Sequence, residues 1–141
     1  MRRKTTATLL AILLVTLQAL SVYAAEPKQA EPPKKMRTTA YCTGHTTASG
    51  TPVRYGVAAV DKSHMGCTAI VYARGENGPG EVLGIFECED TGKGADSDGD
   101  GIGAVEAGWV IDIYFPTLEE CKAWMALTQS KVYVQYIEAE G

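Results

Sequence analysis

Short runs of β-branched and aromatic residues, separated by polar or glycine-rich turns, recur from Arg37 onward and constrain the fold more than any other feature. Such runs are typical of strands, because these side chains suit the pleated surface of a sheet. The runs predict strands at 38–42, 56–60, 68–72, 81–88, 110–115 and 131–136. Thr117, with Glu120 behind it, forms a capping box that predicts one short helix. Six strands and one helix in about 105 residues predict an all-β fold, a small closed β-barrel.

The segment 110–115 carries the most informative polar residue, Asp112, between two isoleucines. Side chains alternate along a strand, so two faces are expected. The core-facing set would be Trp109, Ile111, Ile113 and Phe115, and the opposite set Val110, Asp112 and Tyr114. Partial burial would raise the pKa of Asp112, because loss of water disfavours the charged form. Such an acid suits general acid catalysis, although an ordinary solvent-facing aspartate fits the same pattern.

The amino end is typical of a secretory signal peptide. A basic start at 2–4 precedes an apolar run and a small-residue cleavage pattern ending at Ala24. An uncleaved anchor is the alternative, but the run is shorter than the ~20 residues of a spanning helix. Residues 1–24 are therefore interpreted as the leader, 25–36 as a Pro-rich charged linker, and 37–141 as one domain. The mature chain would be secreted or cell-wall associated, outside the cell or in the periplasm, with no membrane span.

Charge and cysteine content narrow the partners and the redox setting. The leader holds three of the 13 basic residues and none of the 17 acidic ones, which leaves a net charge of −7 on the rest. This charge argues against nucleic acid or anionic lipid as a partner. Four cysteines in an exported chain suggest two disulfides, with three possible connectivities. The pairing expected here is Cys42 with Cys88 and Cys67 with Cys121, and a zinc site is less favoured because no C-x-x-C pair occurs.

Two more aspartates stand at strand ends. Asp61 follows an apolar strand, and Asp90 follows another and precedes Thr-Gly. Residues at strand ends lie where clefts form. Turn and cap roles are the alternative for both, since aspartate often fills them.

Taken together, five short motifs occur in a characteristic order. They are Thr-Ala-Tyr-Cys at 39–42, Thr-Ala-Ser-Gly at 47–50, Ala-Val-Asp at 59–61, Glu-Asp-Thr-Gly at 89–92 and Ile-Asp-Ile-Tyr-Phe at 111–115. This order resembles the 3D domain, named for three aspartates that match Asp61, Asp90 and Asp112. The resemblance implies a double-psi β-barrel related to membrane-bound lytic transglycosylase A and to expansin-like wall proteins. It also implies cleavage of peptidoglycan between N-acetylmuramic acid and N-acetylglucosamine, leaving 1,6-anhydromuramic ends, in cell-wall remodelling.

Roles in such a reaction can be assigned to the matching residues. Asp112 would act as the single acid, because the muramic 6-hydroxyl is itself the nucleophile, whereas ordinary glycosidases need two carboxylates. Asp90 would orient substrate or raise the pKa of Asp112 by like-charge repulsion. The expected substrate-binding residues are Asp61, Thr47, Ser49, Tyr41 and Tyr114. No cofactor is expected, and the protein is expected to be a monomer.

Three other interpretations stay open. The groove could bind wall glycan without cutting it, as an expansin-like module does, or the chain could be a small exported interaction domain, and fold alone does not separate these. The loop with Asp96, Asp98 and Asp100 looks like the start of a calcium loop. Ala104 and Ala107 stand where later ligands would be, so a solvated acidic loop is the alternative, and no metal is assigned.

Overall fold

The computed structural model describes residues 30–140, so the predicted leader lies outside the described residues. The elements are β1 (Lys34–Tyr41), β2 (Val57–Val60), the 3₁₀ helix η2 (Lys62–His64), β3 (Thr68–Arg74), β4 (Pro79–Thr91), β5 (Val110–Tyr114), α2 (Leu118–Thr128) and β6 (Lys131–Ile137). The six predicted strands and the helix are confirmed, as is the all-β class. Within the described part of the chain, no helix is long and apolar enough to cross a membrane.

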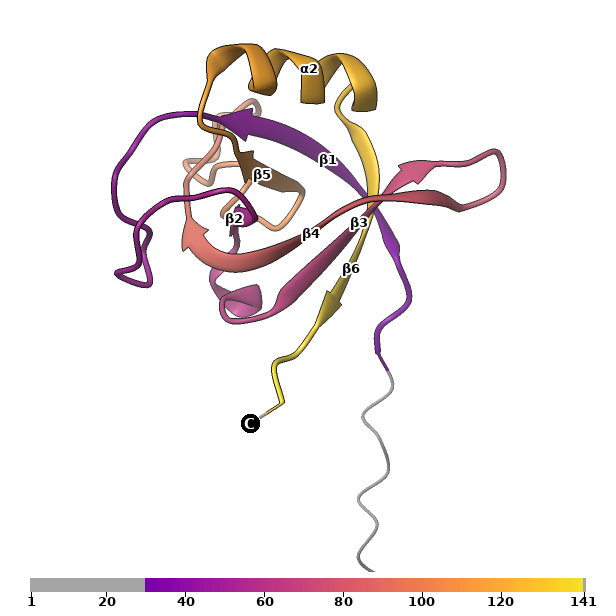
Figure 1. Cartoon of the computed structure of the whole chain (residues 1–141), viewed down its shortest axis with the longest axis horizontal. Helices are drawn as coiled ribbons and strands as arrows, with labels where there is room; N and C mark the ends of the chain where they lie inside the picture. The colour runs from indigo at the N-terminus through magenta and orange to yellow at the C-terminus, as the bar shows by residue number, and fades with distance from the viewer. Residues whose placement is uncertain (1–29, 141) are drawn as a thin grey trace, which may run out of the picture.

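The strands form one sheet that closes on itself as a ring, in the order β1-β5-β2-β4-β3-β6 (Figure 1). Two neighbouring pairs, β1 with β5 and β2 with β4, are parallel, and the other four are antiparallel. Every pairing joins one of the first three strands to one of the last three. The pairing scheme also stays the same when β1, β2 and β3 exchange places with β4, β5 and β6. The two halves of the chain therefore hold equivalent places in the ring.

The core fills the ring with side chains from every strand. Its fully buried residues include Val57, Val60, Val71, Ile111, Ile113, Val132 and Val134. Helix α2 lies along β1 (Figure 1) and contributes Trp124, whose indole N–H donates to the Thr38 hydroxyl at 2.9 Å. The predicted capping box of Thr117 and Glu120 is confirmed at the start of this helix.

Three details differ from the sequence-based expectation. Strand β1 begins at Lys34, inside the predicted linker, because residues 34–37 pair with β6. Trp109 was expected in the core but is 57% exposed, since β5 begins only at the next residue. Val110 was expected to face outward but is buried. Ile111 and Ile113 are fully buried, and Phe115 is partly buried against the core, as predicted.

The cysteines have neighbours that differ from the predicted pairing. The thiol of Cys121, in α2, shares a hydrogen bond with Cys42, which directly follows β1. Cys67 and Cys88 face each other, with the Cys88 N–H donating to the Cys67 carbonyl at 3.0 Å. No two cysteine sulfurs of the described chain are joined. The ring thus places together Cys42 with Cys121 and Cys67 with Cys88.

Candidate functional site

A row of four residues crosses four adjacent strands at one level of the ring. Thr39 of β1 pairs with Asp112 of β5, Asp112 pairs with Ala59 of β2, and Ala59 pairs with Asp90 of β4. Strands lie about 4.8 Å apart, so the two aspartates sit about 10 Å apart at the backbone, on either side of a small alanine. The sheet therefore gathers two of the three predicted aspartates into one site.

A β-bulge brings Asp90 into this row. Ala58 pairs with Cys88, but Ala59 pairs with Asp90, so the register skips Glu89. A bulge inserts one extra residue and redirects the side chains that follow it, and bulges are common beside active sites. Without this bulge, Glu89 would occupy the place beside Ala59.

Asp112 lies half-buried on the outer face of β5. Its Oδ1 accepts a hydrogen bond of 2.8 Å from the Thr39 hydroxyl. Burial is the main cause that raises the pKa of Asp112; the Thr39 hydrogen bond opposes the shift, and the charge of Asp90 adds to it. A carboxyl with a raised pKa keeps its proton closer to neutral pH, which is the property a general acid needs.

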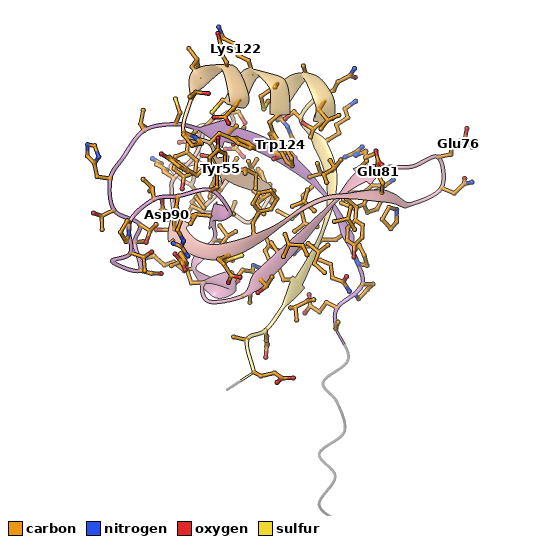
Figure 2. All side chains as sticks on the ribbon, viewed as in Figure 1. Tyr55, Glu76, Glu81, Asp90, Lys122 and Trp124 are labelled. Carbon is orange, nitrogen blue, oxygen red and sulfur yellow. The ribbon has the colours of Figure 1, made fainter. Side chains whose placement is uncertain are left out.

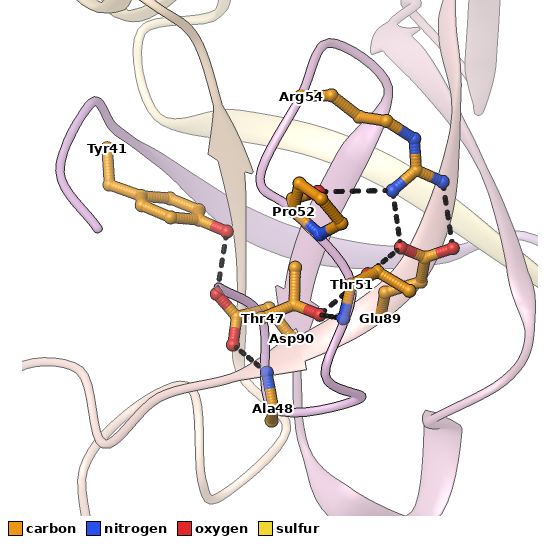
Figure 3. Close-up of polar contacts among 8 residues, drawn as sticks. All are labelled: Tyr41, Thr47, Ala48, Thr51, Pro52, Arg54, Glu89 and Asp90. Atoms are coloured by element: carbon orange, nitrogen blue, oxygen red, sulfur yellow. Dashed lines mark hydrogen bonds and ion pairs between the residues drawn. The ribbon is translucent and has the colours of Figure 1, made fainter. Parts of the chain in front are cut away.

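Asp90 has a different environment, because its oxygens are already engaged (Figure 3). Oδ2 accepts from the Tyr41 hydroxyl at 2.9 Å, and Oδ1 accepts from the backbone N–H of Ala48 at 2.9 Å. Oδ1 also accepts from the backbone N–H of Thr91 at 2.9 Å. Burial and the hydrogen bond to Asp90 raise the pKa of Tyr41 far above its usual range, so the phenol stays a donor. These contacts occupy both oxygens of Asp90 and hold its side chain in one orientation, which suits positioning more than proton transfer.

The loop after β1 is fastened to β4 beside this site (Figure 3). The buried Thr47 shares a 2.8 Å hydrogen bond with the Thr51 hydroxyl, and Thr51 donates to Glu89 at 2.6 Å. Arg54 donates two hydrogen bonds, of 2.6 and 2.8 Å, to the same Glu89 carboxylate. Thr47 is thus engaged within the loop, whereas Ser49 is exposed at its turn.

Tyr41 and Tyr114 lie beside the two aspartates, and Tyr55 contacts the start of α2. Tyr41 and Tyr114 meet edge to face with ring centroids 5.4 Å apart. Tyr55 is 61% exposed, and its hydroxyl donates to Glu120 at the start of α2. The aromatic face of a tyrosine can pack on a sugar ring while its hydroxyl stays hydrogen-bonded. Sequence reasoning missed Tyr55 and Thr39, because neither stands out from ordinary loop and strand residues.

Asp61 lies outside the row, just past the end of β2. Its Oδ1 contacts His64 Nδ1 at 2.6 Å, and its Oδ2 accepts from the Ser63 N–H at 3.2 Å, so it caps η2. Burial alone would raise the pKa of Asp61, but the hydrogen bonds of Ser63 and His64 outweigh it and hold the pKa below its usual value. Asp61 also lines a hollow of about 360 Å³ with Thr91, the residue after Asp90. It therefore borders the site from one side.

The acidic loop gathers three carboxylates. Asp96, Asp98 and Asp100 offer oxygens within 4.8 Å of one another. The oxygens of Asp96 accept the N–H groups of Gly99 and Gly101 at 2.9 and 3.0 Å. These hydrogen bonds hold the loop in an acidic turn whose carboxylates bind its own backbone. We assign no metal ion to it.

Comparison of the chain with models of protein families, with curated proteins and with solved structures gave no match.

Proposed function

We propose that this ring is a double-psi β-barrel of the 3D type and that the chain is an exported peptidoglycan lytic transglycosylase. The observation that carries the proposal is the half-buried Asp112 with its raised pKa, placed in one row with Asp90, whose two oxygens accept three hydrogen bonds. The five ordered motifs and the two parallel strand pairs support the same assignment.

The reaction needs one acid. Asp112 gives its proton to the glycosidic oxygen between muramic acid and glucosamine, and the bond to the muramic C1 breaks. The muramic 6-hydroxyl then bonds to C1, and its proton passes to the Asp112 carboxylate, which restores the acid. No water is consumed, and the product carries a 1,6-anhydromuramic end.

The hydrogen bonds of Asp90 favour this route over inverting hydrolysis. An inverting glycosidase separates its two carboxyls by roughly 6.5–9.5 Å and uses one of them as the base for a water molecule. The carboxyl groups of Asp112 and Asp90, in the same row of residues, could be separated by such a distance. However, the two oxygens of Asp90 already accept three hydrogen bonds, from Tyr41, Ala48 and Thr91, which leaves them little room to hold an attacking water.

A non-catalytic glycan-binding module is the second candidate. The exposed Tyr55 and the pair Tyr41 and Tyr114 favour it, because aromatic faces bind sugars whether or not a bond is cut. Incubation of the mature chain with purified peptidoglycan, followed by mass analysis of the released muropeptides, separates the two. Anhydromuropeptides support the transglycosylase. Binding to sacculi without release supports the module, and products that have gained water point to hydrolysis.

A further inference from the structure

The outer face of β1 changes from basic to site-forming along its length. Lys35, Arg37, Thr39 and Tyr41 alternate with the buried Met36 and Thr38, so these four share the outer face. Thr39 and Tyr41 belong to the site. The two cations precede it on the same strand, with Arg37 about 6.6 Å and Lys35 about 13 Å from Thr39 along the chain.

A hollow of about 330 Å³ lies at this basic end. Its lining includes Lys34, Lys35, Arg37, Arg74 and Trp109 and holds no acidic residue. Trp109 is 57% exposed, and its carbonyl accepts from the Arg37 N–H at 3.1 Å, which joins its backbone to the strand that carries the cations. We call Lys35, Arg37, Arg74 and Trp109 the basic strip.

The cations of the strip are available to a ligand. The ion pairs found among residues 30–140 join Arg54 to Glu89 and His64 to Asp61, and neither uses the strip. Lys131 faces Arg37 on β6 and adds a further positive charge at its edge. A concentration of like charge is notable in a chain whose mature part is strongly acidic, because it attracts anions against the net charge.

The charges along the outer face, from the basic strip to the aspartates, indicate which kind of anionic ligand could bind there. One end carries cations and an exposed indole, and the other end carries Asp112 and Asp90. A uniformly charged polymer such as a nucleic acid would meet repulsion at the aspartates. A glycan with a carboxylate on some sugars and none on others satisfies both ends. Arginine binds carboxylates through its planar fork, and the indole packs on the sugar ring.

We propose that the basic strip is a subsite for a carboxylate-bearing sugar of the glycan, next to the sugars held at Asp112. This inference rests on the proposed function for the identity of the glycan, since muramic residues carry carboxylates on a lactyl group or on an attached peptide. The ligand extends along β1 and β5, with its acidic group at Arg37 and Lys35 and its neutral linkage at Asp112.

The test measures binding of glycan fragments to chains carrying Asp112→Asn, which prevents turnover. The fragments are peptidoglycan glycans with peptides, the same glycans stripped of peptides, and neutral chitooligosaccharides. Arg37→Gln is expected to weaken binding of the acidic glycans about two- to fivefold, and Lys35→Gln with Arg37→Gln about tenfold. Lys122→Gln, an exposed charge on α2 (Figure 2), is the matched control and is expected to change nothing. Melting temperatures verify the fold of each variant.

The outcomes separate this inference from the proposed function. Selective loss of acidic-glycan binding, stronger at low salt, supports the subsite, and the two acidic glycans show whether the lactyl or the peptide carboxylate is bound. If the double variant binds acidic glycans as tightly as the parent, or loses neutral ones equally, the subsite is overturned. If the wild type releases no anhydromuropeptides but the selective loss is seen, the proposed reaction fails and the subsite stands. If the wild type forms anhydromuropeptides and the double variant, made with Asp112 intact, keeps the wild-type KM, the subsite fails and the reaction stands.

Discussion

Replacement of Asp112 by asparagine tests the proposed chemistry at its central atom. The carboxyl is half-buried on β5, and Oδ1 accepts the Thr39 hydroxyl at 2.8 Å. The asparagine side chain has nearly the same volume, and its oxygen can still accept that hydrogen bond. It has no acidic proton to give to a glycosidic oxygen. The change therefore removes the proposed acid and leaves the packing in place.

The expected loss is about 10²–10⁴ in rate, the usual contribution of general acid catalysis. This corresponds to about 2.7–5.4 kcal/mol of transition-state free energy. Stability is expected to move the other way at neutral pH. Burial raises the pKa of Asp112 in the folded state, so ionisation destabilises that state relative to the unfolded chain. This destabilisation is absent below the unfolded pKa, develops as pH rises through the folded pKa, and is missing in Asp112→Asn.

The assay compares anhydromuropeptide release by wild type and Asp112→Asn, together with urea unfolding of both at acidic and neutral pH. Asp98→Asn, in the acidic loop, is a matched control that removes one carboxylate elsewhere. Activity of the wild type is expected to fall as pH rises through the folded pKa of Asp112. A folded Asp112→Asn that cuts peptidoglycan at the wild-type rate would refute the assignment.

The other predictions concern the surroundings of the site. Thr39→Val removes the hydrogen bond that lowers the pKa of Asp112, so the alkaline limb of the activity–pH profile should move to higher pH; an unchanged limb would contradict this. Hydrogen bonds from Arg54, and to a lesser extent from Thr51, lower the pKa of Glu89 from 4.5 to about 2, so the stability they give should be present above pH 4.5 and be lost as pH falls toward 2. Arg54→Gln should therefore flatten the acid limb of a urea-unfolding pH series, and a limb as steep as that of the wild type would count against the ion pair. In the oxidised protein, non-reducing peptide mapping should find the neighbouring cysteines joined, Cys42 with Cys121 and Cys67 with Cys88. Reduction should then lower the free energy of unfolding by about 2–4 kcal/mol, and a peptide joining Cys42 to Cys88 would contradict the pairing.

Local patterns in the sequence were sufficient for the elements and for one face of β5. The alternation of Ile111 and Ile113 with Asp112 predicts which side chains enter the core, because a strand has a fixed period of two. The capping box predicts where α2 begins for a similar reason, since its hydrogen bonds join residues three apart. Trp109 was misplaced because alternation does not reveal the residue at which a strand starts.

Features that depend on how the strands pair could not be predicted from the sequence. Thr39 and Asp112 are 73 residues apart, and only the parallel pairing of β1 with β5 brings them together. The bulge that puts Asp90 in the row has no local signal in residues 81–88, since the extra residue matters only against β2. The cysteine neighbours follow from the same long-range registers, so spacing along the chain could not choose among three connectivities.

The strand pairing of the ring has a consequence for how the chain acquires its structure. Because every pairing joins one half of the chain to the other, β1, β2 and β3 have no partner among themselves. A ribosome that has released only the first half has released no pair of strands able to form this sheet. The contacts that close the ring are distant in sequence, which makes folding slow. Closure waits for β6, the last strand, which pairs with both β1 and β3. The first half of the nascent chain should therefore stay without paired strands until strands of the second half have been made.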